Sequence, residues 1–423
     1  MADCGRAAAR LFQRHMNPPI STSGADRSQD TRATAAPPRR LAALDVFRGL
    51  AVAGMIIVND PGSWQHVWWP LDHAPWHGWT PTDIVFPAFL FAVGTALGLS
   101  FPRRLDPGDR RVLWGKIGRR VLALIALGLA FTLIQHHSLE TLRLPGVLQR
   151  IGLCYGLAAA LTLLTARPGP DGRWGLNLPV IAGTILLILA AYWAAMALIP
   201  VPGFGAGVLT PEGNLAGYVD RAVLTTRHMW GGGNDARGNI VYDPEGLLST
   251  FPALVNILCG VFVAVAWRRR PDHAAGWVAI GGVALLAAGL LLDPVFPLNK
   301  RLWTSSFALA TSGVSAILFA LCMVLCGAAT RRASVDRWLA PFRVFGMNAI
   351  LAYSLSVLLA IAAAQPIVPA GQGVTSPMGW IFARIVGLVS DPWLASFLCS
   401  LVLLALVFAA IFPLHRRGIH LRL

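Results

Sequence analysis

The stretch that decides the fold is LPVIAGTILLILAAYWAAMALI, residues 178–199, in which 22 consecutive residues carry no charge. A helix crosses the hydrocarbon core of a membrane with about 20 apolar residues. A strand of a membrane barrel would instead alternate apolar and polar residues. The stretch therefore predicts a membrane-spanning α-helix, and the long apolar runs exclude a β-barrel.

Further apolar runs lie on both sides of this stretch, and no internal repeat relates them. The predicted spans cover residues 42–59, 83–100, 112–134, 147–165, 178–199, 247–267, 275–293, 303–327, 342–364 and 393–413. A shorter apolar segment, residues 377–390, carries Arg384 and is predicted to be an interfacial or re-entrant helix. The predicted fold class is all-α: a polytopic integral membrane protein with about ten transmembrane helices.

The composition of the 423 residues agrees with this class. Hydrophobic residues make up 55% of the chain and charged residues 13%, whereas soluble domains carry about 25% charged residues. The mean hydropathy is +0.59. Soluble globular enzymes, disordered chains and collagen-like fibres are therefore excluded. The six cysteines show neither a zinc spacing nor a disulfide framework, so no metal site is predicted.

The net charge of +15 comes from arginine clusters between the spans and is read as a topology signal, not as a nucleic-acid surface. With the N-terminus in the cytoplasm, 26 of the 35 lysine and arginine residues fall in cytoplasmic segments, as the positive-inside rule requires. An even number of spans then puts both termini in the cytoplasm. The transmembrane domain is predicted over residues 41–423, with its longest outside loop at residues 200–246.

Residues 1–40 are polar and lack the apolar core of a signal peptide. They are predicted to form a disordered cytoplasmic tail, with a mitochondrial transit peptide as the alternative. Three motifs that combine a proline with an acid are typical of helix starts. In Thr80-Pro81-Thr82-Asp83, Thr80 is the expected N-cap, Pro81 the first helical residue and Asp83 the acid of the first turn; Asp243-Pro244-Glu245 and Asp391-Pro392 look similar.

The densest group of polar and aromatic residues, 59–87, joins the outer ends of the first two spans. Its tryptophans are typical of an aromatic belt at the membrane interface, but a belt does not explain His66, His73 and His77. A histidine can take a proton from an amine nucleophile or attack an acyl donor itself. Asn59 can donate a hydrogen bond to a developing oxyanion. Asp83 can orient a histidine, although capping the second span would be a sufficient role.

Ionisable residues inside membrane segments are costly and usually functional. Asp45 and Arg48 lie three residues apart in the first span. Two interpretations stay open: a simple ion pair, or a cavity in which Arg48 faces an anionic ligand. Further polar candidates, which could instead form hydrogen bonds between helices, are Arg150, Asn299, Lys300, Arg301 and Asn348.

Several motifs, taken together, resemble the heparan-α-glucosaminide N-acetyltransferase family and in particular its bacterial members. They are LDVFRGL (44–50), VN (58–59), HAPWHG (73–78), TDIVFP (82–87), GVLQRIG (146–152), DPEG (243–246), PLNKRLWT (297–304) and FGMNA (345–349). The resemblance covers roughly residues 40–415. It implies an acyltransferase of the bacterial inner membrane that moves acetyl from cytoplasmic acetyl-CoA to an amino sugar or envelope saccharide on the outer face.

The resemblance also implies roles for individual residues. It makes His73 the active-site histidine and Asn59 the asparagine that works with it, and Asp83 would support them. The residues expected to hold acetyl-CoA are Arg48, Arg150, Asn299, Lys300, Arg301 and Asn348. The expected partners are the saccharide acceptor and the lipid bilayer, with no nucleic acid and with a homodimer left open.

Three questions stay open at this stage. The lysosomal members carry a longer lumenal domain before the first shared span, so a long heparan chain is not the expected acceptor here. The family mechanism is argued either as an acetyl-histidine intermediate or as direct attack by the amine. The alternative functions are a secondary transporter for a sugar or amino sugar, and an acyltransferase that uses a longer acyl-CoA.

Overall fold

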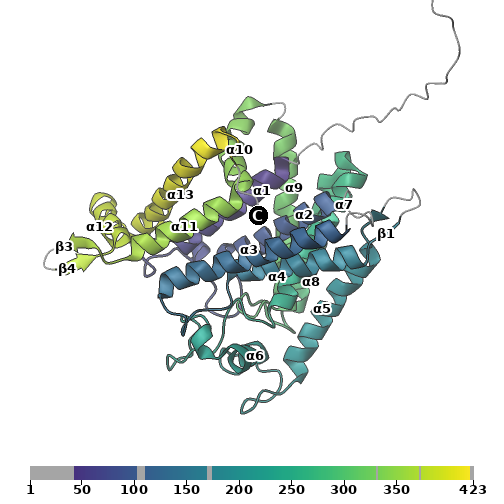
Figure 1. Ribbon diagram of the computed structural model, residues 1–423, viewed down its shortest axis with the longest axis horizontal. Coiled ribbons are helices and arrows are strands. Elements are labelled where there is room, and N and C mark those ends of the chain that lie inside the picture. Colours follow the sequence, from purple (N-terminus) through teal and green to yellow (C-terminus); the bar gives the residue numbers. More distant parts are fainter. Residues whose placement is uncertain (1–41, 102–109, 169–173, 330–331, 371–372, 420–423) are drawn as a thin grey trace, which may run out of the picture. The chain divides into compact units, whose positions relative to one another are not determined.

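The computed structural model describes residues 42–101, 110–168, 174–329, 332–370 and 373–419 (Figure 1). The predicted tail, residues 1–40, lies outside the described residues. Residues Leu41–Leu423 form one compact unit. Its helices are α1 (Ala42–Asn59), α2 (Pro81–Ser100), α3 (Arg110–His136), α4 (Val147–Leu164), α5 (Leu178–Leu198), α6 (Leu215–Leu224), α7 (Thr250–Arg269), α8 (Ala274–Leu292), α9 (Ser305–Ala329), α10 (Ala333–Met347), α11 (Ala349–Ala364), α12 (Pro377–Val389) and α13 (Pro392–Arg416). Two short hairpins pair β1 (Arg167–Pro168) with β2 (Trp174–Gly175), and β3 (Val368–Ala370) with β4 (Gly373–Thr375).

The all-α membrane fold is confirmed. Nine helices in the described ranges are long and apolar enough to cross a membrane, and α10 with α11 makes a tenth candidate. The short helix α12 covers the segment predicted at 377–390. Most predicted span boundaries agree with the helices to within three residues, because long apolar runs are strong signals.

The prediction of one continuous span at residues 342–364 is wrong, because two helices cover this region. The chain bends by 80° between α10 and α11, and the break falls at Asn348. The Asn348 side chain is buried, and its Nδ2 donates to the carbonyl oxygen of Val344 at 2.9 Å. Broken helices are tolerated at membrane depth when such groups satisfy the freed backbone. Asn348 therefore supports the bend.

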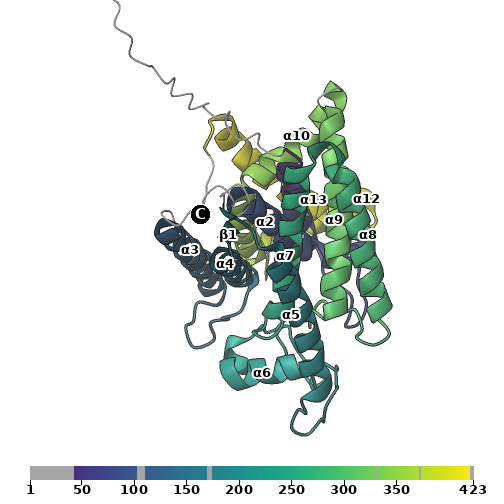
Figure 2. The same cartoon turned by 90° about the vertical axis from the view of Figure 1, so that its right-hand side faces the viewer.

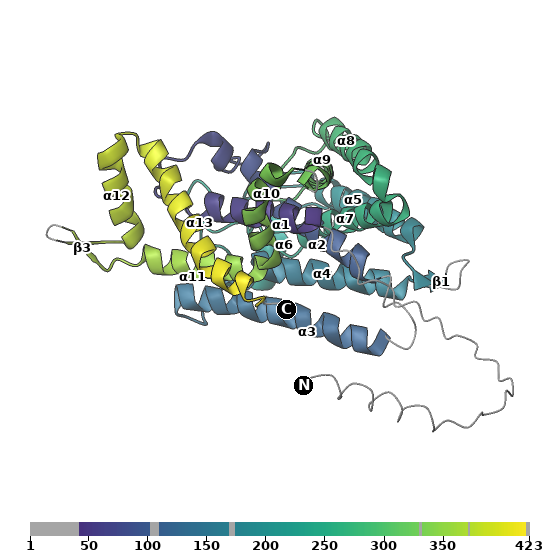
Figure 3. The ribbon, with the colours of Figure 1, turned by 90° about the horizontal axis from the view of Figure 1, so that it is seen from above.

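The centre of the bundle consists of α1, α2, α4 and α7, which are mostly buried, whereas less than a third of the apolar length of α3, α5, α8 and α13 is buried. Figure 3 shows α1 in the middle, with α8 and α9 on one side and α12 and α13 on the other. Figure 2 shows α6 beyond one end of the upright helices α5, α7, α8 and α9. The exposed apolar helices are the ones suited to face lipid.

α1 and α10 cross with their backbones in contact. A Cβ added at Gly49 would lie 1.8 Å from the carbonyl oxygen of Phe342, and one at Gly346 would lie 1.7 Å from that of Asp45. Small residues allow such close approach between membrane helices. This crossing fixes the direction of α10 just before the break.

The Gly346→Ala variant tests this crossing. Alanine favours a helix over glycine by roughly 0.5–1 kcal/mol, but here its methyl group meets backbone that cannot move aside. We expect a net loss of about 1–3 kcal/mol, measured as a lower melting temperature of the purified protein. Gly118→Ala in α3 is the matched control, since nothing lies within 4 Å of the added Cβ. Equal melting temperatures for the two variants would contradict the close crossing.

Candidate active site

The loop between α1 and α2 is anchored to distant segments. Trp76 donates its indole N–H to the carbonyl oxygen of Leu209 at 2.8 Å. The backbone N–H of Gly78 donates to the carbonyl oxygen of Leu298 at 2.7 Å, and Gly78 adopts a φ of 93°, which favours glycine. These bonds hold the histidine-containing loop against the loop between α5 and α6 and against the segment between α8 and α9.

His73 and Asp83 form the centre of the site. The Nδ1 atom of His73 lies 2.6 Å from Oδ1 of Asp83. The other carboxylate oxygen accepts the backbone N–H groups of Ala74 at 3.1 Å and Thr80 at 3.0 Å. The predicted helix start at Thr80–Asp83 is therefore confirmed as a capping box. Asp83 is only 1% exposed, and it caps α2 and contacts the histidine at once.

Lys300 reaches the same centre from a distant part of the chain. Its Nζ lies 3.0 Å from Nδ1 and 3.1 Å from Nε2 of His73, and 3.5 Å from Oδ1 of Asp83. Since the two distances to the ring nitrogens are nearly equal, the ammonium group lies over the ring face. Burial lowers the pKa of Lys300, although Asp83 and Glu245 oppose this shift.

Asn299 holds the turn that presents Lys300. Its Oδ1 accepts the backbone N–H of Leu302 at 2.9 Å, and its own backbone N–H donates to Oγ1 of Thr304 at 3.1 Å. The Asn299 side chain is fully buried. Its Nδ2 also lies 3.4 Å from Nδ1 of His77. Asn299 therefore positions the turn and lies outside the cavity described next.

A cavity of about 440 Å³ opens beside this centre, and we call it the catalytic cavity. Its lining residues are Met55, Val58, Asn59, Trp64, Asp72, His73, Ala74, Thr82, Asp83, Val85, Phe86, Val147, Trp230, Pro244, Glu245, Lys300 and Arg301. The structure thus brings Asn59, His73 and Asp83 together with two of the predicted cations. The catalytic cavity combines apolar walls with a small number of polar groups that point into it, as is typical of ligand sites.

A smaller cavity of about 70 Å³, the inner cavity, lies next to the catalytic cavity. It contains Arg48 and Arg120, and Met55 and Val147 line both cavities. Arg48 pairs with Asp45 at 2.9 Å and donates to the carbonyl oxygen of Gly346 at 2.5 Å. The ion pair of the first interpretation is therefore present, and Arg48 also lines a cavity, whereas binding of an anionic ligand there stays a prediction.

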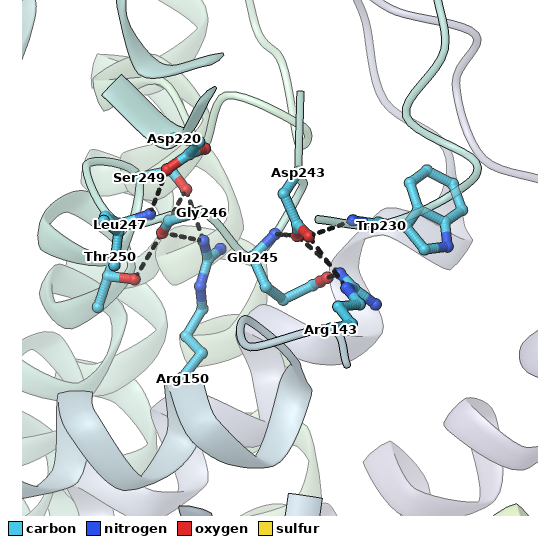
Figure 4. Close-up of polar contacts among 10 residues, drawn as sticks. All are labelled: Arg143, Arg150, Asp220, Trp230, Asp243, Glu245, Gly246, Leu247, Ser249 and Thr250. Atoms are coloured by element: carbon cyan, nitrogen blue, oxygen red, sulfur yellow. Dashed lines mark hydrogen bonds and ion pairs between the residues drawn. The ribbon is translucent and has the colours of Figure 1, made fainter. Parts of the chain in front are cut away.

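Two predicted anion-binding residues lie elsewhere. Arg150 is 1% exposed and is absent from the lining of both cavities; it donates to the Gly246 carbonyl oxygen at 3.0 Å and to Ser249 Oγ at 2.5 Å (Figure 4). Asn348 belongs to the helix break and also lies outside both cavities. His66 packs against Phe382 and Trp393 instead of facing the catalytic cavity.

An ion-pair network that the sequence reading missed closes one wall of the catalytic cavity. Arg143 donates to both oxygens of Asp243, at 3.0 and 2.6 Å, and to Glu245 at 2.6 Å (Figure 4). These carboxylates raise the pKa of Arg143. The backbone N–H of Trp230 also donates to Oδ2 of Asp243 at 2.7 Å. The network fixes Trp230 and Glu245 in the cavity wall.

The expected helix start at Asp243–Glu245 is therefore wrong, since α7 begins at Thr250. The two acids bind Arg143 instead of capping a helix. The available signal was the DPEG motif together with an arginine 100 residues earlier in the chain, but a sequence does not say which arginine and acids meet.

Residues 40–204 match a family profile described as heparan-alpha-glucosaminide N-acetyltransferase, catalytic. The heparan-alpha-glucosaminide N-acetyltransferase of Homo sapiens is 31% identical over 391 residues, which is 82% of this chain and 58% of the human protein. The protein of that name from Mus musculus is 30% identical over 390 residues, with the same two shares. The chain thus spans less than two thirds of the length of these relatives. The resemblance indicated by the motifs is confirmed.

Proposed function

We propose that this chain, a relative of the heparan-α-glucosaminide N-acetyltransferases, is a transmembrane acetyltransferase of a bacterial inner membrane. It moves acetyl from cytoplasmic acetyl-CoA to an amino sugar or another envelope saccharide on the outer face. The membrane fold and the acetyltransferase activity for which the relatives are named support this class of reaction.

The observation that carries the proposal is the pair of adjoining cavities. Arg48 lines the inner cavity and Asn59 the catalytic cavity, and the two residues lie about 16 Å apart along α1. The CoA phosphates bind at the cationic inner end, and the pantetheine arm passes Met55 and Val147. The thioester then reaches His73 while the nucleotide stays on the cytoplasmic side.

His73 is the reacting base or acyl acceptor. Because its Nδ1 faces the Asp83 carboxylate, that nitrogen carries the proton and Nε2 keeps its lone pair. Nε2 then has two available routes. In the first it attacks the thioester carbon, the CoA thiolate leaves, and the acceptor amine then takes the acetyl group from the imidazole. In the second it takes the proton of the acceptor amine as that amine attacks the thioester carbon, and the CoA thiolate leaves.

Asn59 and Lys300 stabilise the negative charge that develops on the acetyl oxygen. Both are N–H donors that line the catalytic cavity, and fixed donors of this kind act most strongly where water is excluded.

Transfer of labelled acetyl by the purified protein tests the proposed activity. Labelled acetyl-CoA and glucosamine are incubated with the protein in detergent, and N-acetylglucosamine is the expected product. Labelled protein that accumulates without acceptor would favour the acetyl-histidine route. Failure to bind or turn over acetyl-CoA would overturn the proposal.

Arg120 provides a test of the donor route. Its guanidinium lies 4.4 Å from the Tyr155 ring centre, and its buried Nε has no hydrogen-bond partner in the described part of the chain. We expect Arg120→Ala to raise the Kd for acetyl-CoA roughly tenfold or more, because a charge-assisted phosphate bond is lost. Titration calorimetry measures this, with the exposed neighbour Arg119→Ala as the control. Unchanged binding by Arg120→Ala would contradict the route.

Secondary transport of a sugar or amino sugar is the second candidate function. The 80° break between α10 and α11 favours it, since transporters often place their sites at broken helices. Uptake of glucosamine into proteoliposomes without any acyl donor would support transport. Product formation that depends on acetyl-CoA, with no such uptake, would exclude it.

A further inference from the structure

A third cavity, of about 390 Å³, adjoins the catalytic cavity, and we call it the side cavity. Asn59 and Trp64 line both cavities. The other residues of its lining come mainly from the segment after α1 and from one face of α11; they are Asp60, Pro61, Gln135, Tyr353, Ser356, Val357, Ala360, Ile361, Ala363, Ala364, Gln365 and Met378. A molecule in the side cavity would therefore reach the reaction centre past Asn59 and Trp64.

Asp60 is the acid of this cavity, and it lacks a counter-charge. Its backbone carbonyl oxygen accepts the Ser400 hydroxyl at 3.0 Å, which fixes the main chain. Within the ranges that the structure describes, the carboxyl group makes no hydrogen bond or ion pair. No lysine, arginine or histidine is among the described lining residues. Burial raises the pKa of Asp60 to about 7, as expected for a carboxyl group that has lost water without gaining a partner.

Two of the three acids of the catalytic cavity differ from Asp60 because they are paired with cations. Asp83 faces His73 and Lys300, and Glu245 is paired with Arg143. The third, Asp72, is exposed and accepts the backbone N–H of His73 at 2.7 Å. Lys300 and Arg301 add positive charge to that cavity, whereas no cation is among the described lining residues of the side cavity, so a cationic ligand is attracted to Asp60.

We propose that the side cavity binds the protonated amino group of the acceptor before transfer, that Asp60 is the carboxylate that receives it, and that the amine, after losing one proton, passes Asn59 and Trp64 to reach the thioester at His73. This inference rests on the proposed function, since it names the site at which the amine acceptor is recognised. Trp64, which is 64% exposed, offers an aromatic face between the two cavities against which the sugar ring can pack. Asp60 then selects a primary ammonium over a hydroxyl group at the same position of the sugar.

The test is binding of glucosamine to the full chain in detergent without any acyl donor. We expect glucosamine to raise the melting temperature of the wild type, and glucose, with a hydroxyl group in place of the amine, to have no comparable effect. Asp60→Asn keeps the shape of the side chain and removes its charge, and should weaken glucosamine binding roughly 10- to 100-fold. Glu140→Gln removes an exposed charge from the loop after α3 and should bind like the wild type.

A second measurement uses the unmodified protein and so does not depend on how a variant folds. A water-soluble carbodiimide activates carboxyl groups, and glucosamine bound in the side cavity should capture the activated Asp60 as an amide, with release of the urea, in preference to the exposed Glu140; glucose should not, as read by mass spectrometry of the peptides. Equal glucosamine affinity of wild type and Asp60→Asn, or no preferential amide at Asp60 in the wild type, would overturn the proposal. Since no acetyl-CoA is present, a failure of acetyl transfer remains a separate result.

Discussion

Replacing His73 by alanine is expected to lower the rate of acetyl transfer by about 1000-fold or more, because the variant loses the base or acyl acceptor. Acetyl-CoA should still bind, since the cations of the inner cavity remain. The protein should also stay folded, because the His73 side chain is about one third exposed and its loop is anchored through Trp76 and Gly78. Initial rates with labelled acetyl-CoA and glucosamine provide the measurement.

His66→Ala is the matched control for this variant. His66 belongs to the same loop, but it packs on Phe382 and Trp393 instead of lining the catalytic cavity. Its removal should leave the rate within a few-fold of the wild type. Turnover by His73→Ala at the wild-type rate would show that another residue carries the reaction.

Replacing Lys300 by methionine should have the second largest effect. We expect kcat to fall roughly 100- to 1000-fold, the loss typical when one oxyanion donor is removed. The Kd for acetyl-CoA should change by less than about twofold, since a residue over the His73 ring acts on the reacting carbonyl group. A role in phosphate binding, which the sequence favoured, predicts the reverse: a higher Kd with kcat retained.

Lys116→Met is the control for Lys300→Met, because the chain has no lysine other than these two. Lys116 is exposed on α3, so its loss should leave both constants unchanged. Weaker acetyl-CoA binding by Lys300→Met with an unchanged kcat would show that Lys300 binds the CoA phosphates. It would contradict a role of Lys300 in stabilising the oxyanion.

The sequence predicted the fold well because each membrane span can be recognised from its own long run of apolar residues. The break at Asn348 was missed for the same reason: residues 342–364 are mostly apolar, and Asn348 interrupts them only once. The bend depends on the contact of Gly346 with α1 and on the hydrogen bond from Asn348 to Val344. The first of these contacts involves a helix far away in the sequence, so the apolar run does not reveal it.

The candidate site was only partly predictable. His73 and Asp83 lie ten residues apart, so a loop and a helix start could indicate that they are neighbours. Lys300 lies 227 residues from His73, and the sequence marked it only as a cation near a span. Arg150 looked similar, yet it bonds to Gly246 and Ser249 in the protein interior. Nothing local distinguishes these two cations, because their partners come from distant segments.

Transfer of acetyl across the membrane is best tested with vesicles that have donor and acceptor on opposite sides. The protein is reconstituted in one known orientation, with labelled acetyl-CoA on the face near Arg48 and Arg120 and glucosamine on the face near His73. We expect labelled N-acetylglucosamine on the glucosamine side, and none from His73→Ala. Product that forms only when donor and acceptor share one side would contradict transfer across the membrane.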